Sequence, residues 1–314
     1  MAPRRQRRSF SLSFTGTRLT FTESGHSTGW HALHIHLPHS LQTAFLRDTI
    51  GPLMRNTPAV GRFFFLRYWQ GGPHIRLRLD GADEETVASV RAALAAAVPP
   101  MTEELTAEYA YEVSLQSELA RLEHEQPAGI RPPGTVEPMP YTPEYEKYGG
   151  TDGVRIAEDL FCRTSVAVLE LAGVRAGPEP KAPVGEAIRI MAMSLKGSGL
   201  DVEESREFLA RYEEFWRRYV PPGSDRAWPA LYDRTRRKVL DLCGAVWLDG
   251  RADVFHDVYA DARAAAGAVL DSAQYGRCLA NYLHTTNNRL GIIPAGEAFV
   301  AHVMHRSLGE LEHV

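Results

Sequence analysis

The chain has 314 residues, of which 44% are hydrophobic and 24% charged, a composition that excludes disordered, collagen-like and coiled-coil proteins. The net charge of −4 divides unevenly, since residues 1–80 carry +8 and the rest of the chain carries −12. No run of 18 apolar residues and no secretory signal is present, so we expect a cytoplasmic globular protein with no membrane partner.

The N-terminal segment is predicted to be a basic tail with a hairpin, followed by a strand and a helix. Residues 1–29 begin with four closely spaced arginines, and residues 10–21 alternate in hydrophobicity around a glycine, which is typical of a hairpin. Residues 30–37 also alternate, which predicts a strand with one buried face. A helix is then expected to begin with a cap at Ser40 and to end near Pro52.

Further strands and one helix are predicted before residue 122. Residues 62–69 and 74–80 flank Gln-Gly-Gly-Pro, which indicates a second hairpin. An Ala-rich amphipathic helix is expected over residues 84–98, and residues 106–114 are a candidate strand. Residues 30–122 are therefore predicted to be rich in β-structure.

The second half of the chain is predicted to be helical. Residues 123–143 contain six prolines and no hydrophobic period, which indicates a long loop. Beyond it, residues 153–314 show helical periodicity, so the fold class is α+β, with an N-terminal mixed or antiparallel sheet followed by a helical C-terminal half. The expected helices span about 153–173, 183–197, 202–219, 227–247, 252–269, 273–287 and 294–311.

The most distinctive strand reads HIRLR and places polar residues on one face. His74, Arg76 and Arg78 alternate with apolar residues, so they share a side of the predicted sheet. Neighbouring arginines repel unless they face acids or an anionic or carbonyl-bearing ligand, and Arg67 on the preceding strand is expected to join them. The alternative is that the arginines pair with acids of the helical half.

A second group of candidate residues closes the proline-rich loop. Glu144, Lys147 and Tyr148 are all proton-transfer groups, and the following Gly-Gly allows a ligand to approach the backbone. The alternative is a hinge that is packed by Tyr148.

A third group ends a predicted helix. His284 lies near the expected C-terminus, where the helix dipole favours a protonated imidazole. Asn288 and Arg289 are candidate substrate contacts, and the alternative is that they cap the last carbonyl groups.

Metal and cofactor sites are not expected. His34 and His36 lack a third ligand at a suitable spacing, which favours a basic, peptide-facing strand over a metal pair. Cys162, Cys243 and Cys278 form no zinc spacing, and no nucleotide-binding or familiar hydrolase motif is present.

The order of these motifs resembles one family. Trp30 opens a His-rich strand, and FFFLRYWQGGPHIRLRL, PEYEKYGG, AEDLFCRTS and HTTNNRLG follow along the chain. This arrangement resembles the C-terminal domain of lantibiotic dehydratases, which also occurs as free-standing proteins of thiopeptide biosynthesis. The resemblance covers residue 30 to the end, so one domain is expected over residues 30–314, after the tail and hairpin of residues 1–29.

The resemblance implies two activities. One is elimination of glutamate from glutamylated Ser or Thr, which gives dehydroalanine or dehydrobutyrine. The other is pyridine synthesis, a formal [4+2] cycloaddition between two dehydroalanines of a precursor peptide, which closes a macrocycle and expels the leader peptide. A third possibility, from another class, is a non-catalytic partner that only binds the precursor.

The resemblance also assigns residues. The strand pair of an eliminating domain resembles Arg76 and Arg78, its acid resembles Glu144, and its histidine matches His284. Its second arginine is replaced by Lys147, and its acid before Ser165 is replaced by Thr164. Since lysine does not reproduce the planar fork of arginine, these changes favour the pyridine synthase.

Cofactor-free cycloaddition makes specific demands on the site. It needs two alkenes held together and an amide converted to its iminol tautomer. His284 is the expected acid/base, Tyr148 a hydrogen-bond donor, and Arg76 or Arg78 the group that polarises the carbonyl.

The expected partner is a dehydrated, azole-containing precursor peptide whose acidic leader binds the basic N-terminal segment; no nucleic acid is expected, and a homodimer is left open. Expected substrate contacts are Arg67, His74, Lys147, Asn288, Arg289, His34 and His36.

Overall fold

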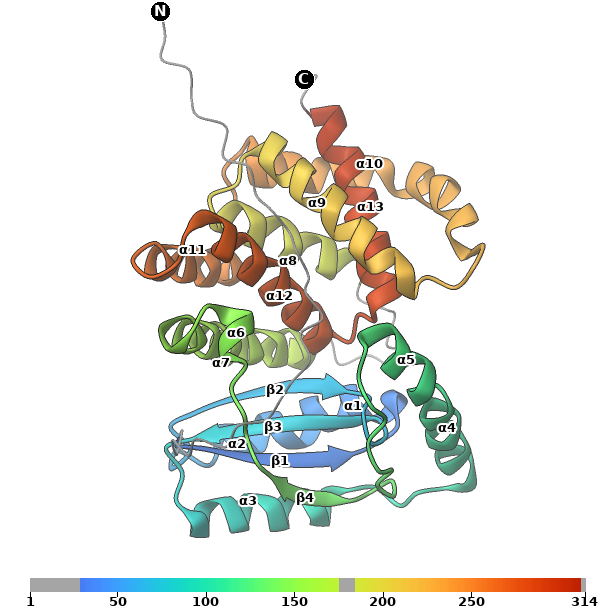
Figure 1. The fold of residues 1–314 in the computed structure, drawn as a ribbon, viewed down its shortest axis with the longest axis vertical. Helices are drawn as coiled ribbons and strands as arrows, with labels where there is room; N and C mark the ends of the chain where they lie inside the picture. The colour runs from blue at the N-terminus through green and yellow to red at the C-terminus, as the bar shows by residue number, and fades with distance from the viewer. Residues whose placement is uncertain (1–28, 175–183, 312–314) are drawn as a thin grey trace, which may run out of the picture.

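A four-stranded antiparallel sheet lies at one end of the computed structural model, and helices fill the other end (Figure 1). The structure describes residues 29–174 and 184–311, so the hairpin predicted at 10–21 lies outside the described residues. The strand order is β2-β3-β1-β4. The strands are β1 (Trp30–His36), β2 (Arg62–Tyr68), β3 (His74–Asp80) and β4 (Val136–Met139).

Helices surround the sheet and form all of the described C-terminal half, which confirms the α+β fold class. Within the described residues, no helix is long and apolar enough to cross a bilayer. The elements before residue 150 are α1 (His39–Phe45), a π-helical turn (Leu46–Ile50), α2 (Gly51–Arg55), α3 (Glu84–Ala97), α4 (Glu103–Ser114), α5 (Gln116–Glu123) and α6 (Tyr145–Tyr148). The later helices are α7 (Thr151–Val174), α8 (Val184–Gly197), α9 (Val202–Trp216), α10 (Trp228–Trp247), α11 (Val254–Ala266), α12 (Ser272–Leu290) and α13 (Pro294–Leu311), with 3-10 turns at Arg217–Tyr219 and Ser224–Ala227.

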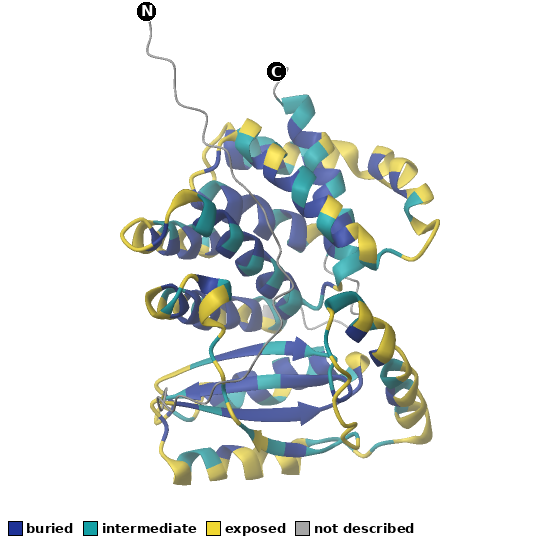
Figure 2. Cartoon of the chain, viewed as in Figure 1, coloured by how far each residue is buried: buried dark blue, intermediate teal, exposed yellow. Residues whose placement is uncertain are grey.

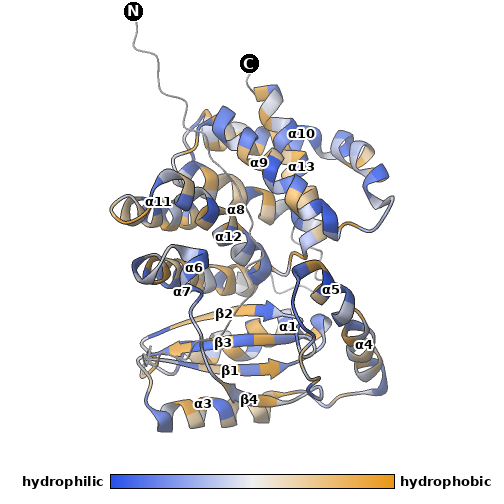
Figure 3. Cartoon of the chain, viewed as in Figure 1, coloured by the Kyte–Doolittle hydropathy of each residue, from blue (hydrophilic) through white to orange (hydrophobic). Residues whose placement is uncertain are grey.

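The sheet has one apolar face and one face rich in histidine and arginine. Because side chains alternate along a strand, Leu33 and its partner Leu77 share one face, while His34 and its partner Arg76 share the other. Helices α1 and α2 lie behind the sheet in Figure 1. Figure 3 shows hydrophilic stretches on β1 and β3, and Figure 2 shows that these strands are largely buried. The polar face of the sheet is therefore largely buried, although it carries two arginines.

The helix after β1 differs from the prediction at both ends. Its N-cap is Pro38, which makes no side-chain cap, and Ser40 instead donates its hydroxyl to Glu108 of α4 at 2.8 Å. The helix does not end near Pro52 but continues through a π-helical turn to Arg55. Pro52 lies in the first turn of α2, where a missing N–H is best tolerated.

Two predictions for residues 106–143 are wrong. Residues 106–114 belong to α4, because Thr102 caps the helix by accepting from the N–H of Leu105, and two glutamates follow in the first turn. The predicted proline-rich loop contains β4, which pairs with β1. Pro138 is tolerated there because β4 is an edge strand.

The helices predicted beyond residue 150 are present with end shifts of a few residues, and one shift matters for the site. Helix α12 runs to Leu290 and ends at Gly291, whose φ of +85° suits a left-handed helix end. His284 therefore lies nearly two turns inside the helix. The expectation that it feels the dipole of the C-terminal turn is wrong, because that effect fades within the last turn.

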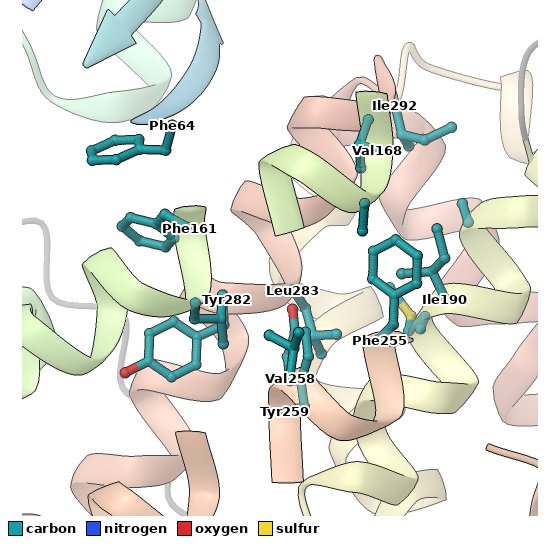
Figure 4. Packing of buried hydrophobic residues seen from close by; sticks show 14 of the residues in the cluster. Phe64, Phe161, Val168, Ile190, Phe255, Val258, Tyr259, Tyr282, Leu283 and Ile292 are labelled. Atoms are coloured by element: carbon teal, nitrogen blue, oxygen red, sulfur yellow. The ribbon is translucent and has the colours of Figure 1, made fainter. Parts of the chain in front are cut away.

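The sheet and the helical half share one core. Phe64 of β2 packs against Phe161 of α7 with ring centroids 5.5 Å apart, and Phe161 contacts Tyr282 of α12 at 6.3 Å. Figure 4 shows this row continuing into the core between α7, α8, α11 and α12. The helices are thereby held in a fixed position over one edge of the sheet.

Candidate functional site

Three neighbouring histidine rings occupy the polar face of the sheet. The rings of His34 and His74 lie 4.6 Å apart, and those of His36 and His74 lie 4.7 Å apart. All three side chains are buried. Burial lowers the pKa of His74 to about 3 and lowers the pKa values of His34 and His36 as well, so the three rings are neutral at physiological pH.

The hydrogen bonds of His74 fix its tautomer. Its Nδ1 lies 2.8 Å from the carbonyl oxygen of Gly72 and must carry the proton, while its Nε2 accepts from Nε of Arg76 at 3.2 Å. The neutral ring of His74 thus orients the guanidinium of Arg76.

The two arginines of the HIRLR strand stack on aromatic rings. The guanidinium of Arg76 lies 3.3 Å from the ring centroid of Tyr68, and that of Arg78 lies 5.4 Å from the ring centroid of Tyr141. Within the described residues, neither guanidinium forms an ion pair, and Nη1 of Arg78 is buried without a hydrogen-bond partner. Burial lowers the pKa of Arg78 to about 9. The alternative of pairing with acids of the helical half is therefore not found in the described chain.

Arg67 does not join these arginines. It pairs with Ile75 in the sheet, so its side chain lies on the opposite face from Arg76. Its guanidinium donates to Thr43 of α1 at 3.1 Å and to the carbonyl oxygen of Arg289 at 3.3 Å. The expected grouping is wrong because the register of the hairpin, which the turn sets, places Arg67 beside an apolar residue.

A carboxylate and an aromatic ring extend the site beside Arg78. The hydroxyl of Tyr141 donates to Glu158 of α7 at 2.8 Å. Glu158 is buried, and burial raises its pKa. Sequence reasoning missed both residues; Glu158 lies in the AEDLFCRTS segment, where only its place in a family motif was a signal.

The residues that close the proline-rich segment separate into exposed and buried groups. Glu144 and Lys147 form an ion pair of 3.2 Å with substantial exposure. Tyr148 is buried, stacks on Tyr282 with centroids 5.8 Å apart, and meets Phe161 edge-on. Burial raises the pKa of Tyr148 well above its usual value. These contacts match the hinge alternative, in which Tyr148 packs the segment.

His284 forms a second centre with a residue that the sequence did not reveal. Its Nδ1 lies 2.7 Å from Oε1 of Glu297 on α13, and its ring stacks on Trp216 of α9 with centroids 4.5 Å apart. Glu297 is fully buried, whereas the His284 side chain is 27% exposed. An acid within the otherwise apolar start of α13 was the available signal.

Asn288 and Arg289 join α12 to the sheet rather than cap its carbonyl groups. The Asn288 amide accepts from the N–H of Arg67 and donates to its carbonyl oxygen, both at 2.8 Å. Nε of Arg289 donates to the hydroxyl of Ser165 at 3.0 Å, and that hydroxyl also accepts from the N–H of Phe65. The edge strand β2 is thereby covered by side chains of α7 and α12.

A row of contacts extends from His284 to the end of α5. Trp216, which stacks on His284, lies 5.4 Å from the ring of Tyr219, whose hydroxyl donates to Glu123 at the end of α5 at 3.4 Å. On the sheet side, burial lowers the pKa of Arg76, and the nearby carboxylates of Glu144 and Glu125 oppose that shift. These contacts link the turn after α9 to the end of α5, and α6 packs against α7 and α12.

No group of three or more His, Cys, Asp or Glu side chains in the described part of the chain has a geometry suited to a metal ion. Two hollows of the described surface are lined by residues outside these groups, one beside α3 and the other, of about 440 Å³, between α8 and the loop before α11.

The sequence matches the family model of the lantibiotic biosynthesis dehydratase C-terminal domain over residues 30–308. The chain belongs to this family. The match begins at the first residue of β1 and ends within α13, so the family domain comprises both the sheet and the helical half.

Solved structures share the fold of this dehydratase C-terminal domain. TbtD, a pyridine synthase from thiomuracin biosynthesis, aligns with a TM-score of 0.70 and 19% identity, over 90% of this chain and 99% of its own. TsrL aligns with a TM-score of 0.64 and 16% identity, over 91% and 95%. The tRNA-dependent lantibiotic dehydratase MibB from Microbispora sp. 107891 aligns with a TM-score of 0.59 and 22% identity, over 94% of this chain and only 29% of its own. No curated protein gives a significant sequence match.

Proposed function

We propose that this dehydratase C-terminal domain is a pyridine synthase of thiopeptide biosynthesis. Its substrate is a dehydrated, azole-containing precursor peptide, and its reaction joins two dehydroalanines by a formal [4+2] cycloaddition. The alignment with free-standing TbtD along nearly the whole of both chains supports this choice, whereas the dehydratase MibB is more than three times longer than the part that aligns.

The observation that carries the proposal is the ion pair between Lys147 and Glu144. Lys147 stands where the resemblance implies an arginine that holds a glutamyl carboxylate. Its ammonium is already 3.2 Å from the carboxylate of Glu144, and a lysine presents one point charge rather than a planar fork. An ammonium cannot offer a glutamyl carboxylate the two parallel hydrogen bonds of a guanidinium, so the site is poorly suited to elimination.

The first step is tautomerisation of the amide that joins one dehydroalanine to its neighbour. His284 accepts the amide N–H proton through Nε2 and returns a proton to the carbonyl oxygen, which gives the iminol and a 2-azadiene. Arg76 or Arg78 stabilises the negative charge that develops on that oxygen, since neither arginine is committed to a carboxylate in the described chain.

Ring closure and aromatisation then follow without a change in oxidation state. The two methylene carbons bond to each other, and the iminol carbon bonds to the α-carbon of the second dehydroalanine. Loss of water removes the iminol oxygen together with a proton from one former methylene carbon. Cleavage of the bond between that α-carbon and nitrogen, with loss of a proton from the other former methylene carbon, releases the leader as its amide. His284 delivers the proton that the leaving nitrogen requires.

Binding lowers the barrier mainly by holding the two alkenes together, which general estimates put at up to about 7–11 kcal/mol. Neutral rings at His34 and His36 can donate to or accept from peptide groups without repelling the nearby arginines, while His74 orients Arg76. Tyr148, Asn288, Arg289 and Arg67 are assigned to packing, which keeps the helices in place over the sheet.

The test is incubation of the full-length protein with a synthetic leader-bearing peptide that contains two dehydroalanines, followed by mass spectrometry. We expect intact leader amide and a lighter macrocycle. His284→Ala should lower turnover by roughly 10²- to 10⁴-fold and leave leader binding nearly unchanged. His302→Ala is the matched control, because His302 is also paired with a glutamate, Glu213, but packs against Trp228.

The unpaired Nη1 of Arg78 favours one alternative, a lyase that holds a glutamyl carboxylate. Release of glutamate from a glutamylated peptide, with no change in the dehydroalanine peptide, would support that lyase. Tight binding with no mass change in either peptide would support a non-catalytic partner.

A further inference from the structure

Glu297 is a fully buried carboxylate that gathers donors from two other helices. Its Oε1 accepts from Nδ1 of His284 at 2.7 Å. Its Oε2 accepts from Nδ2 of Asn287 at 3.2 Å and from the hydroxyl of Tyr212 on α9. The two oxygens thus have different partners: one serves the histidine, and the other serves two neutral donors.

This arrangement fixes the tautomer of His284. An ionised carboxylate only accepts hydrogen bonds, so Nδ1 of His284 must carry the proton. In the neutral ring the lone pair is then on Nε2, the nitrogen that is free to meet a substrate proton. The stack on Trp216, with 24° between the rings, fixes the orientation of the same imidazole.

Comparison with His302 of α13, another histidine that bonds to a glutamate, shows what is particular to Glu297. His302 also bonds to a glutamate, Glu213, but that carboxylate is ion-paired with Arg217 at 2.6 Å, and Nε2 of His302 is buried without a partner. Within the described residues, Glu297 has no lysine or arginine partner. The cation beside it is His284, once that ring is protonated. Its charge is therefore available to the imidazolium that forms when His284 accepts a proton.

We propose that Glu297 is a positioning residue for the reaction, and this inference rests on the proposed role of His284. Glu297 holds Nδ1 protonated, aims Nε2 at the amide proton of the substrate, and stabilises the resulting imidazolium. Glu297 itself stays ionised, since the proton taken by Nε2 passes on to the carbonyl oxygen of the substrate and never reaches the carboxylate.

The decisive substitution is Glu297→Gln, which keeps the shape of the side chain. Asn287 and Tyr212 both donate to the Oε2 position, so the single oxygen of glutamine belongs there and its NH₂ faces His284. An NH₂ group donates, so Nδ1 must become the acceptor and the proton must move to Nε2. In the variant, Nε2 of His284 therefore no longer has a lone pair to accept a proton, while a side chain of the same shape still fills the position of Glu297.

A structural role is separated from a positioning role by a matched variant. Tyr212→Phe deletes one donor to the same carboxylate and leaves the bond to His284 in place. If Glu297 only holds the helices together, both variants will lower the melting temperature and will change turnover to a similar, small extent. If it positions His284, only Glu297→Gln will change the imidazole.

The experiment combines ¹⁵N NMR of the histidine-labelled full-length protein with the macrocyclisation assay. We expect the neutral His284 ring to be protonated on Nδ1 in the unmodified protein and in Tyr212→Phe, and on Nε2 in Glu297→Gln. We expect kcat to fall by roughly 10²- to 10⁴-fold in Glu297→Gln with KM within about threefold, and to stay within about threefold in Tyr212→Phe.

Several results would overturn the inference. An Nε2-protonated ring in the unmodified protein, or an unchanged tautomer in Glu297→Gln, excludes positioning by Glu297, as does an equal loss of kcat in the two variants. If the unmodified protein does not cyclise the peptide, the proposed function fails, but the NMR measurement still decides whether Glu297 sets the His284 tautomer.

Discussion

Acid should destabilise this protein through the three histidines that are buried on the sheet. Burial lowers the pKa values of His34, His36 and His74, and that of His74 falls to about 3. In the unfolded chain the same rings take up a proton near pH 6.5. Below that pH the unfolded state binds more protons than the folded state, so the free energy of unfolding falls as the pH falls.

The expected loss of stability follows from the difference between the pKa of each ring in the folded and in the unfolded state. A histidine that stays neutral in the fold costs about 1.4 kcal/mol of stability between pH 7.5 and pH 5.5, because the unfolded ring goes from mostly neutral to mostly charged. His74 and His34 together therefore contribute about 3 kcal/mol, and His36 acts in the same direction. The loss continues toward pH 3, where His74 also titrates in the folded state.

The assay is urea unfolding at pH 7.5 and pH 5.5 for the unmodified protein and for His74→Gln. Glutamine does not titrate, so this variant should lose about 1.4 kcal/mol less on acidification, whatever its stability at pH 7.5. His31→Gln, at a partly exposed position of the same sheet, is the control for the loss of an imidazole from a strand. If the free energy of unfolding falls by the same amount between pH 7.5 and pH 5.5 in His74→Gln and in the unmodified protein, the assignment of a neutral, buried ring is refuted.

Three further outcomes are expected. Asn288→Ala removes both hydrogen bonds to the backbone of Arg67 and should lower the free energy of unfolding by about 2 kcal/mol, whereas Asn281→Ala, whose amide bonds only within its own helix, should change it by about 0.5 kcal/mol or less. Gly72→Ala would place a Cβ against the Tyr109 hydroxyl and should lower the melting temperature more than Gly150→Ala, where φ is also positive and nothing lies within 4 Å. Equal losses would mean that backbone strain alone matters. Affinity for an acidic leader peptide should fall steeply from 0.1 M to 1 M salt, as the Debye length shortens from about 10 Å to about 3 Å, and a titration that gives the same Kd at both would show that the basic segment serves something else.

The sequence by itself determined the class of the fold and the sheet face that carries one group of candidate residues. Strand alternation and helical period are local properties, so β1, β2, β3 and the helices from α7 to α13 could be predicted within a few residues. The shared face of His74, Arg76 and Arg78 followed from the same alternation. The strand expected at 106–114 failed, since a threonine cap and two first-turn glutamates made that segment a helix.

Tertiary structure alone decided which of these residues meet. Edge strand β4 forms because β1 offers it backbone partners across about a hundred residues, a contact that the local proline content obscures. Arg67 turns away from Arg76 because the turn between β2 and β3 sets the register, and a shift of one residue would reverse its face. His284 gains Glu297 and Trp216 only when α9, α12 and α13 pack together. Such pairings depend on the distances between elements in the folded chain, and a hydrophobic period along one element carries no information about them.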